Sequence, residues 1–104
     1  CALPICEIGG STLAIDITAA DAGEKIKAAA AQQGGLDIIV HNAGITRDKT
    51  LANMKPEMWD LVININLSAA ERINDYLLSN DGLNANGRIV CVSSISGIAC
   101  LAIE

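Results

Sequence analysis

The sequence predicts an α/β fold built on a parallel sheet. Short aliphatic runs alternate with longer helical patterns, in the strand–helix–strand order that is typical of such sheets. Apolar residues make up 51% of the chain but aromatic residues only 2%, a composition that suits buried parallel strands. Two polar clusters, His41–Gly44 and Ser93–Gly97, each follow an aliphatic run. Because ligands bind beyond the carboxyl ends of parallel strands, we expect both clusters to face one cleft.

The first third of the chain is predicted to contain one strand and one helix. Residues 1–10 show no clear period, so we expect them to be irregular or the tail of a preceding element. Ser11–Ile17 is predicted to be a short strand. Thr18, with an aspartate three residues later, resembles a capping box for a helix over residues 19–33. The two glycines that follow should end this helix.

A second strand and a long helix are predicted next. Leu36–Val40 is an aliphatic run too short for a helix and preceded by glycines, which indicates a buried strand. Residues 45–55 are expected to form a polar loop. Pro56 suits the first position of a helix, because its missing N–H would be unpaired there in any case. The helical pattern continues to about Ser79.

The long helix is predicted to be amphipathic, with one polar residue on its apolar face. The apolar face comprises Trp59, Val62, Ile63, Ala69, Ala70, Ile73 and Leu77. Asn66 is the exception on that face. A turn-rich loop over residues 80–87 and a third aliphatic strand, Arg88–Val92, are expected to follow.

Composition excludes several classes of function. The net charge of −5 and the scattered seven Lys and Arg residues provide no basic stripe, so we expect no nucleic-acid partner. No apolar run approaches the roughly 18 residues of a transmembrane helix, and no charged signal region is present, so we expect a soluble cytoplasmic protein with no membrane partner. One histidine and no Cys-x-x-Cys pair argue against a metal site. All four cysteines are expected to be free thiols in packing positions: Cys1, Cys6, Cys91 and Cys100.

Four short motifs occur in the order and spacing of one enzyme family. They are Asp37–Gly44, Ile45–Asp48, Asn66–Leu67 and Ser94–Gly97. On these motifs the chain resembles the short-chain dehydrogenase/reductases, and among them the 3-oxoacyl-(acyl-carrier-protein) reductases, which carry a similar Asn-Ala-Gly-Ile-Thr-Arg-Asp stretch. The resemblance implies a Rossmann-type three-layer fold with a parallel sheet. It also implies that residues 1–104 are the central part of a single dinucleotide-binding domain.

Two hallmarks of that family have no counterpart in the sequence. No glycine-rich G-x-x-x-G-x-G turn precedes the first predicted strand, and no Tyr-x-x-x-Lys pair follows Ser94. The fold is therefore expected to be incomplete in this chain, which by itself should be inactive.

The resemblance implies catalytic roles for Ser94 and Asn66. Ser94 resembles the family's serine, whose hydroxyl holds the substrate carbonyl oxygen and stabilises the charge that develops there. The alternative is a Ser-Ser pair that ends a strand and caps the next turn. Asn66 resembles the asparagine that kinks the long helix and positions a relay water, the alternative being a packing residue bonded to a neighbour. Either way, a polar group on an apolar face must find a hydrogen-bond partner.

The resemblance also implies a cofactor, NADP or NAD. The residues that would bind it are Asp16, Ile17, Asn42, Ala43, Gly44 and Val92. Asn42–Gly44 would lie against the adenosine ribose, where small residues let a cofactor approach the backbone. Asp16 would receive the adenine, although it could equally be a plain helix-entry residue. His41 stands where the family usually has another asparagine, and we expect it to be a spacer.

The implied activity is reduction of a ketone, with a 3-oxoacyl thioester of acyl carrier protein or CoA as the expected substrate, in fatty acid biosynthesis. The full-length protein is expected to form a homo-oligomer. Two alternatives remain open: a related reductase for another alcohol or ketone, and a non-enzymatic truncated domain that serves as a packing or oligomerisation unit.

Overall fold

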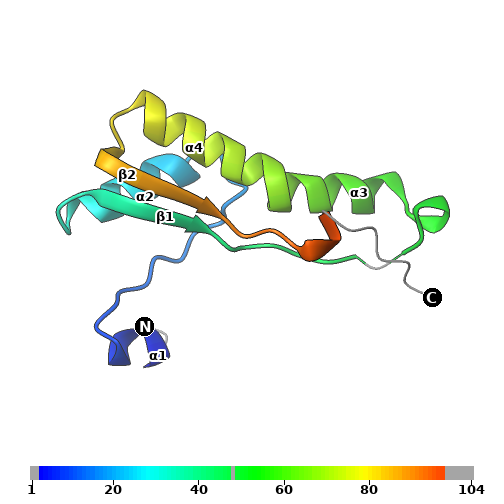
Figure 1. Ribbon diagram of the computed structural model, residues 1–104, viewed down its shortest axis with the longest axis horizontal. Coiled ribbons are helices and arrows are strands. Elements are labelled where there is room, and N and C mark those ends of the chain that lie inside the picture. Colours follow the sequence, from blue (N-terminus) through cyan, green and yellow to red (C-terminus); the bar gives the residue numbers. More distant parts are fainter. Residues whose placement is uncertain (1–2, 48, 98–104) are drawn as a thin grey trace.

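The computed structural model describes residues 3–47 and 49–97. Its regular elements are the helices α1 (Leu3–Glu7), α2 (Ala22–Ala31), α3 (Pro56–Ile63) and α4 (Ala69–Ser79) and the strands β1 (Leu36–His41) and β2 (Leu83–Cys91). A π-helical segment, Asn64–Ser68, joins α3 to α4, so that the three form one long helix beside the sheet (Figure 1). Short 3₁₀ turns occur at Leu51–Asn53 and Ile95–Gly97.

The two strands are parallel and are connected by the long helix. Their register pairs Ile38 with Arg88 and His41 with Cys91. Pro56 begins α3, and the long helix ends at Ser79. These observations confirm the predicted α/β fold with a parallel sheet and the predicted bounds of the long helix.

β2 begins earlier than the sequence predicted. Leu83 already pairs with Leu36, but the next register pair is Ile38 with Arg88, so the intervening residues of β2 form a bulge. Asn86 within this bulge has a φ of +61°, a conformation that asparagine tolerates better than most residues. Residues 83–87 of the predicted loop thus form the irregular part of β2, and the predicted strand at Arg88 forms its regular part.

The core lies on one side of the sheet, between β1, α2 and α4. The buried apolar residues are Ala22, Ala69, Ile73 and Leu77. Ile39 of β1 packs against this cluster, whereas its neighbours Ile38 and Val40 are 59% and 54% exposed. Alternate residues of a strand face opposite sides, so the helices cover one face of the sheet. The described residues therefore form two of the three layers of the expected fold.

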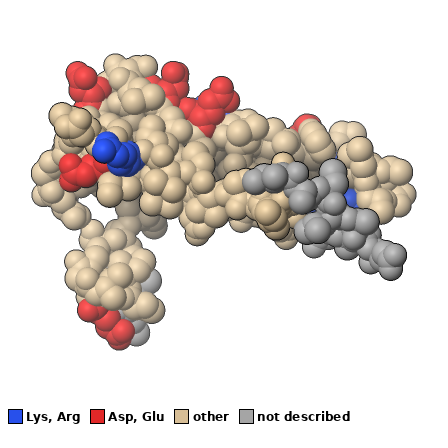
Figure 2. Space-filling view, in the orientation of Figure 1, with Lys and Arg blue, Asp and Glu red and all other residues tan. Residues whose placement is uncertain are grey.

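The chain exposes much more surface than a self-contained protein of its size. Its accessible surface is 7989 Å², whereas a compact monomer of this mass would expose about 5,500 Å². The radius of gyration is 16.3 Å against about 13 Å for a compact chain of this length. In Figure 2 charged side chains are sparse over much of the visible face, and acidic ones gather along the edge near α4. The uncovered face of the sheet leaves apolar residues such as Ile38 and Val40 accessible to solvent.

Residues 3–21 differ from the prediction. Residues 1–10 include the helix α1, which stands away from the sheet (Figure 1). Ser11–Ile17 is not a strand, because a strand needs a hydrogen-bonded neighbour and no described residue pairs with it. The capping box is also wrong: the Thr18 backbone N–H and hydroxyl both donate to Asp16 Oδ1, at 2.9 and 2.7 Å. The helix begins later, at Ala22.

The cysteines were predicted to be free and packed. Cys91 is a free thiol but is exposed. Cys6 is exposed and disulfide-bonded, so the prediction is wrong for this residue, which lies on the detached α1 and has no core to pack into. Cys1 and Cys100 lie outside the described residues, as does Asp48 of the Ile45–Asp48 motif.

Candidate functional site

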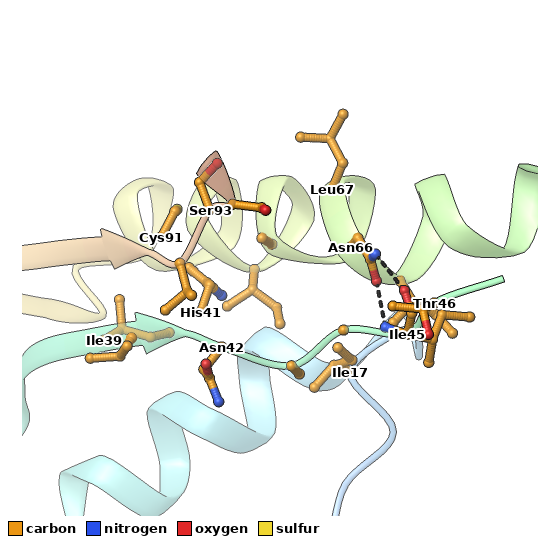
Figure 3. A pocket seen from close by; sticks show the side chains of 18 of the residues that line it. Ile17, Ile39, His41, Asn42, Ile45, Thr46, Asn66, Leu67, Cys91 and Ser93 are labelled. Carbon is orange, nitrogen blue, oxygen red and sulfur yellow. Dashed lines mark hydrogen bonds between the residues drawn. The ribbon is translucent and has the colours of Figure 1, made fainter. Parts of the chain in front are cut away.

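An open cavity of about 910 Å³ lies at the carboxyl ends of β1 and β2, beside the long helix (Figure 3). This volume is typical of small-molecule sites. Its lining is mostly apolar and small, and no Asp, Glu, Lys or Arg is among the described lining residues. The polar lining residues are His41, Asn42, Thr46, Asn66, Ser93 and Ser94. The two polar clusters therefore face one cleft, as the sequence predicted.

The segment Asn42–Gly44 leaves β1 and forms one wall of the cavity. All three of its residues are exposed, so packing around their side chains does not hold this segment. A Cβ added to Gly44 would lie 3.2 Å from Asn66 Oδ1, which is tighter than ordinary van der Waals contact. Any other residue here would require the Asn66 side chain to shift by a few tenths of an ångström.

Asn66 holds the backbone that follows this segment. The Ile45 N–H donates to Asn66 Oδ1 at 2.8 Å, and Asn66 Nδ2 donates to the Ile45 carbonyl oxygen at 2.8 Å (Figure 3). Asn66 lies within the π-helical segment Asn64–Ser68. Such segments interrupt α-helices, frequently at functional sites. The expected need for a hydrogen-bond partner is confirmed, and one Nδ2 hydrogen remains for another acceptor.

Ser94 follows β2 and lines the cavity next to Ser93. The Val92 N–H donates to the His41 carbonyl oxygen at 3.0 Å, which extends the strand pairing to this point. Ser94 Oγ accepts the Ser96 N–H at 3.2 Å. The hydroxyl therefore caps the following turn, as the alternative reading held, yet its own hydrogen is still available to donate to a carbonyl oxygen.

Asp16 is the one predicted site residue that does not line the cavity. The Thr18 hydroxyl and, secondarily, the Thr18 backbone N–H donate to its carboxylate and hold the pKa of Asp16 below its ordinary value. Ile17, next in the chain, does line the cavity. The structure thus gathers seven of the eight predicted site residues: Ile17, Asn42, Ala43, Gly44, Asn66, Val92 and Ser94.

Sequence reasoning missed the pair formed by His41 and Asn74. His41 Nε2 lies 2.7 Å from Asn74 Oδ1, in a partly buried position, and His41 also lines the cavity. Asn74 follows Asn66 by eight residues, which places both amides on the same face of the long helix. This spacing is the signal that could have identified Asn74.

The part of the chain that the structure describes contains neither a cluster of potential metal ligands nor a helix that could span a membrane. No group of three or more His, Cys, Asp or Glu residues there could hold a metal ion. Nor is any helix within residues 3–47 and 49–97 long and apolar enough to cross a membrane.

Comparison with known proteins identifies the family. A family model described as "Enoyl-(Acyl carrier protein) reductase" matches residues 4–102. A 3-oxoacyl-(acyl-carrier-protein) reductase FabG of Thermotoga maritima is 41% identical over 75 residues, which are 72% of this chain and 30% of that protein. A hydroxyacyl-CoA dehydrogenase of Mycobacterium tuberculosis is 37% identical over 88% of this chain and 32% of its own length.

A solved structure shows the same fold. The crystal structure of a short-chain dehydrogenase from Mycobacterium smegmatis matches with a TM-score of 0.74 and 30% identity, over 88% of this chain and 40% of that one. The chain thus spans about a third of the length of the curated relatives it matches. The family model, the relatives and the Rossmann-type structure agree, and the chain belongs to the short-chain dehydrogenase/reductase family.

Proposed function

We propose that the cavity is part of the NAD(P)-binding and active-site cleft of an oxidoreductase that reduces the ketone of a 3-oxoacyl thioester. The observation that carries this proposal is the convergence of Asn42–Gly44, Asn66 and Ser94 on one neutral cavity at the carboxyl ends of two parallel strands. Such a position is where open α/β sheets bind their ligands.

The residues present fit a dinucleotide. Gly44 lines the cavity without a side chain, and Ile17 offers an apolar surface for a planar base. The exposed Asn42–Gly44 wall would lie against the ribose, and Val92 at the end of β2 would border the nicotinamide end. Asp16 does not line the cavity, so it would contribute only if this segment moved toward it; both Thr18 bonds go to Oδ1 and leave Oδ2 open to a ligand. The cofactor would supply the hydride chemistry, and the protein supplies orientation and electrostatics.

Ser94 is proposed to bind the ketone oxygen. Its Oγ accepts the Ser96 N–H, which leaves the hydroxyl hydrogen free to donate to a ketone oxygen. Negative charge develops on that oxygen during reduction, so this donor would stabilise the transition state more than the ground state. Asn66 is proposed to hold the relay water through its remaining Nδ2 hydrogen, while its other amide contacts keep the Ile45 backbone in place.

The acyl thioester is proposed from the relatives. Their names, a 3-oxoacyl-(acyl-carrier-protein) reductase and a hydroxyacyl-CoA dehydrogenase, share an oxygenated acyl thioester but differ in its carrier. The neutral, largely apolar cleft is compatible with an acyl chain. The proposed setting is fatty acid biosynthesis in the cytoplasm, with the full-length protein as a homo-oligomer.

The test is a cofactor titration and a steady-state assay on the protein expressed from its complete reading frame. We expect NADH or NADPH fluorescence to report binding and acetoacetyl-CoA to be reduced. Ser94→Ala should lower kcat by a factor on the order of 10² and leave the cofactor dissociation constant near that of the wild type. Ser93→Ala, which removes the adjacent hydroxyl, is the matched control.

The outcomes separate the proposals. Equal kcat in Ser94→Ala and wild type would refute the role of Ser94. Failure of the wild type to bind either nucleotide would refute the cofactor assignment and favour the packing or oligomerisation alternative. Reduction of simple ketones but not of acetoacetyl-CoA would replace the substrate class while leaving the reductase chemistry in place.

A further inference from the structure

We infer that His41 and Asn74 form a positioning pair, which holds the start of the Asn42–Gly44 segment and thereby sets the affinity of the cleft for its nucleotide. The inference rests on the proposed function for the identity of the ligand, but its geometry stands alone. His41 Nε2 lies 2.7 Å from Asn74 Oδ1 across a sequence separation of 33 residues. This is a hydrogen-bond distance.

Both members of the pair stand on rigid supports. Asn74 follows Ile73, which is 3% exposed, and lies between Ala69 and Leu77, whose exposed fractions are 0%. Its helix is therefore anchored in the core. The His41 backbone is held independently, because its carbonyl oxygen accepts the Val92 N–H from beyond β2. The side-chain bond thus ties the end of β1 to α4.

A second tie holds the other end of the segment. Ile45 is bonded through both its N–H and its carbonyl oxygen to Asn66, so the stretch from His41 to Ile45 is fixed at both ends by amides of one helix. Four extended residues span about 13 Å, and the eight helical residues from Asn66 to Asn74 span about 12 Å. The segment after β1 runs antiparallel to the long helix (Figure 1). Because the two lengths match, both hydrogen-bonded ties can form without stretching the segment or the helix.

The position of the Asn42–Gly44 segment depends on the hydrogen bonds at its two ends. Asn42, Ala43 and Gly44 are exposed and border the cavity, so side-chain packing contributes little to their position. A segment that is ordered before the ligand arrives binds more tightly, because less conformational entropy is lost on binding. Loss of the His41 tie should therefore loosen the segment and weaken nucleotide binding, although His41 need not touch the nucleotide.

The test compares variants of the full-length protein by hydrogen exchange and by cofactor titration. Asn74→Ala and His41→Leu each remove the tie, whereas His41→Gln places a side-chain nitrogen near the position of the imidazole Nε2. Asn80→Ala is the matched control, because it deletes a side-chain amide at the C-cap of the same helix, whose Nδ2 donates to the Tyr76 carbonyl oxygen at 2.8 Å.

We expect Asn74→Ala and His41→Leu to speed exchange in a peptide covering residues 41–46 and to raise the nucleotide dissociation constant about 5-fold, the equivalent of about 1 kcal/mol. The cofactor KM should change more than kcat. The double variant should be no worse than either single one, since the two residues act through one bond. His41→Gln should restore both readouts, and Asn80→Ala should leave both unchanged.

The exchange data decide the inference independently of the proposed function. If Asn74→Ala and Asn80→Ala show the same exchange in the 41–46 peptide, the positioning role is overturned even in a fully active reductase. If the exchange accelerates but the wild type binds neither NADH nor NADPH, the positioning role is supported and the cofactor assignment is refuted. Additive effects in the double variant would also overturn the pair.

Discussion

The contact between Asn66 and Ile45 gives the sharpest stability prediction. Asn66→Ala removes two hydrogen bonds of 2.8 Å, each with a net contribution of about 0.5–1.5 kcal/mol. Asn66 is exposed, so water can replace part of the loss, and alanine recovers about 0.6 kcal/mol of helix propensity. We expect a net loss of about 1 kcal/mol, or a Tm lowered by about 2–4 °C in a protein of 150–250 residues.

Asn64→Ala is the control for this prediction. Asn64 lies in the same π-helical segment, and its Oδ1 accepts one bond from Arg72 Nη2, at 3.0 Å. Both substitutions gain the same helix propensity, so the difference between them reports the two bonds to Ile45 less the single bond from Arg72. Asn66→Asp sharpens the comparison. A carboxylate at neutral pH cannot donate to the Ile45 carbonyl oxygen and repels it, so we expect this variant to be less stable than Asn66→Ala.

The assay is thermal unfolding of the three variants, with hydrogen exchange at the Ile45 amide as the local readout. Asn66→Ala should expose that amide to exchange, and Asn64→Ala should not. The reasoning is refuted if both alanine variants show the same Tm and the Ile45 amide stays protected in each. It would then follow that the segment after β1 is held by contacts other than the asparagine amide.

Three further predictions concern packing, pH and association. Gly23→Ala should destabilise the protein by about 1–2 kcal/mol in chemical denaturation, because the new Cβ would lie 2.8 Å from Tyr76 Cβ, and overpacking outweighs the roughly 0.5–1 kcal/mol gained in helix propensity; equal or higher stability would contradict this. The hydrogen bond and ion pair with Lys25, at 2.9 Å, lower the pKa of Asp21. The small contribution of this pair to stability should therefore be present above the ordinary pKa of an aspartate and vanish as the pH falls through the lowered pKa. Asp21→Asn should flatten the stability–pH curve in that acidic range, and an unchanged curve would exclude the pair as the source of the pH dependence. Residues 1–104 alone should self-associate in size-exclusion chromatography, since the strands are uncovered on one face and unpaired strand edges recruit other chains; a monomer that unfolds cooperatively would show that this surface needs no partner. The same segment should bind no NADH, because its sequence contains no glycine-rich turn for the cofactor phosphates.

Local sequence patterns determined most of the secondary structure and the place of the polar clusters. The aliphatic run at Leu36, the proline at Pro56 and the glycines after α2 are signals carried by a few neighbouring residues, and they predicted β1, the start of α3 and the end of α2. The same patterns placed polar clusters after both strands. Because parallel strands share one carboxyl edge, the common cleft followed from the order of elements alone.

Long-range pairing was decided only by the tertiary structure. Ser11–Ile17 has a strand-like sequence but no described neighbour to bond, so its propensity did not produce a strand. Asn66 could be predicted to need a partner, but not that the partner would be the backbone of a residue 21 positions away. The tie between His41 and Asn74 spans 33 positions, and no local pattern specifies it. Such contacts depend on how the helix lies against the strand, which is settled when the buried faces of both pack together.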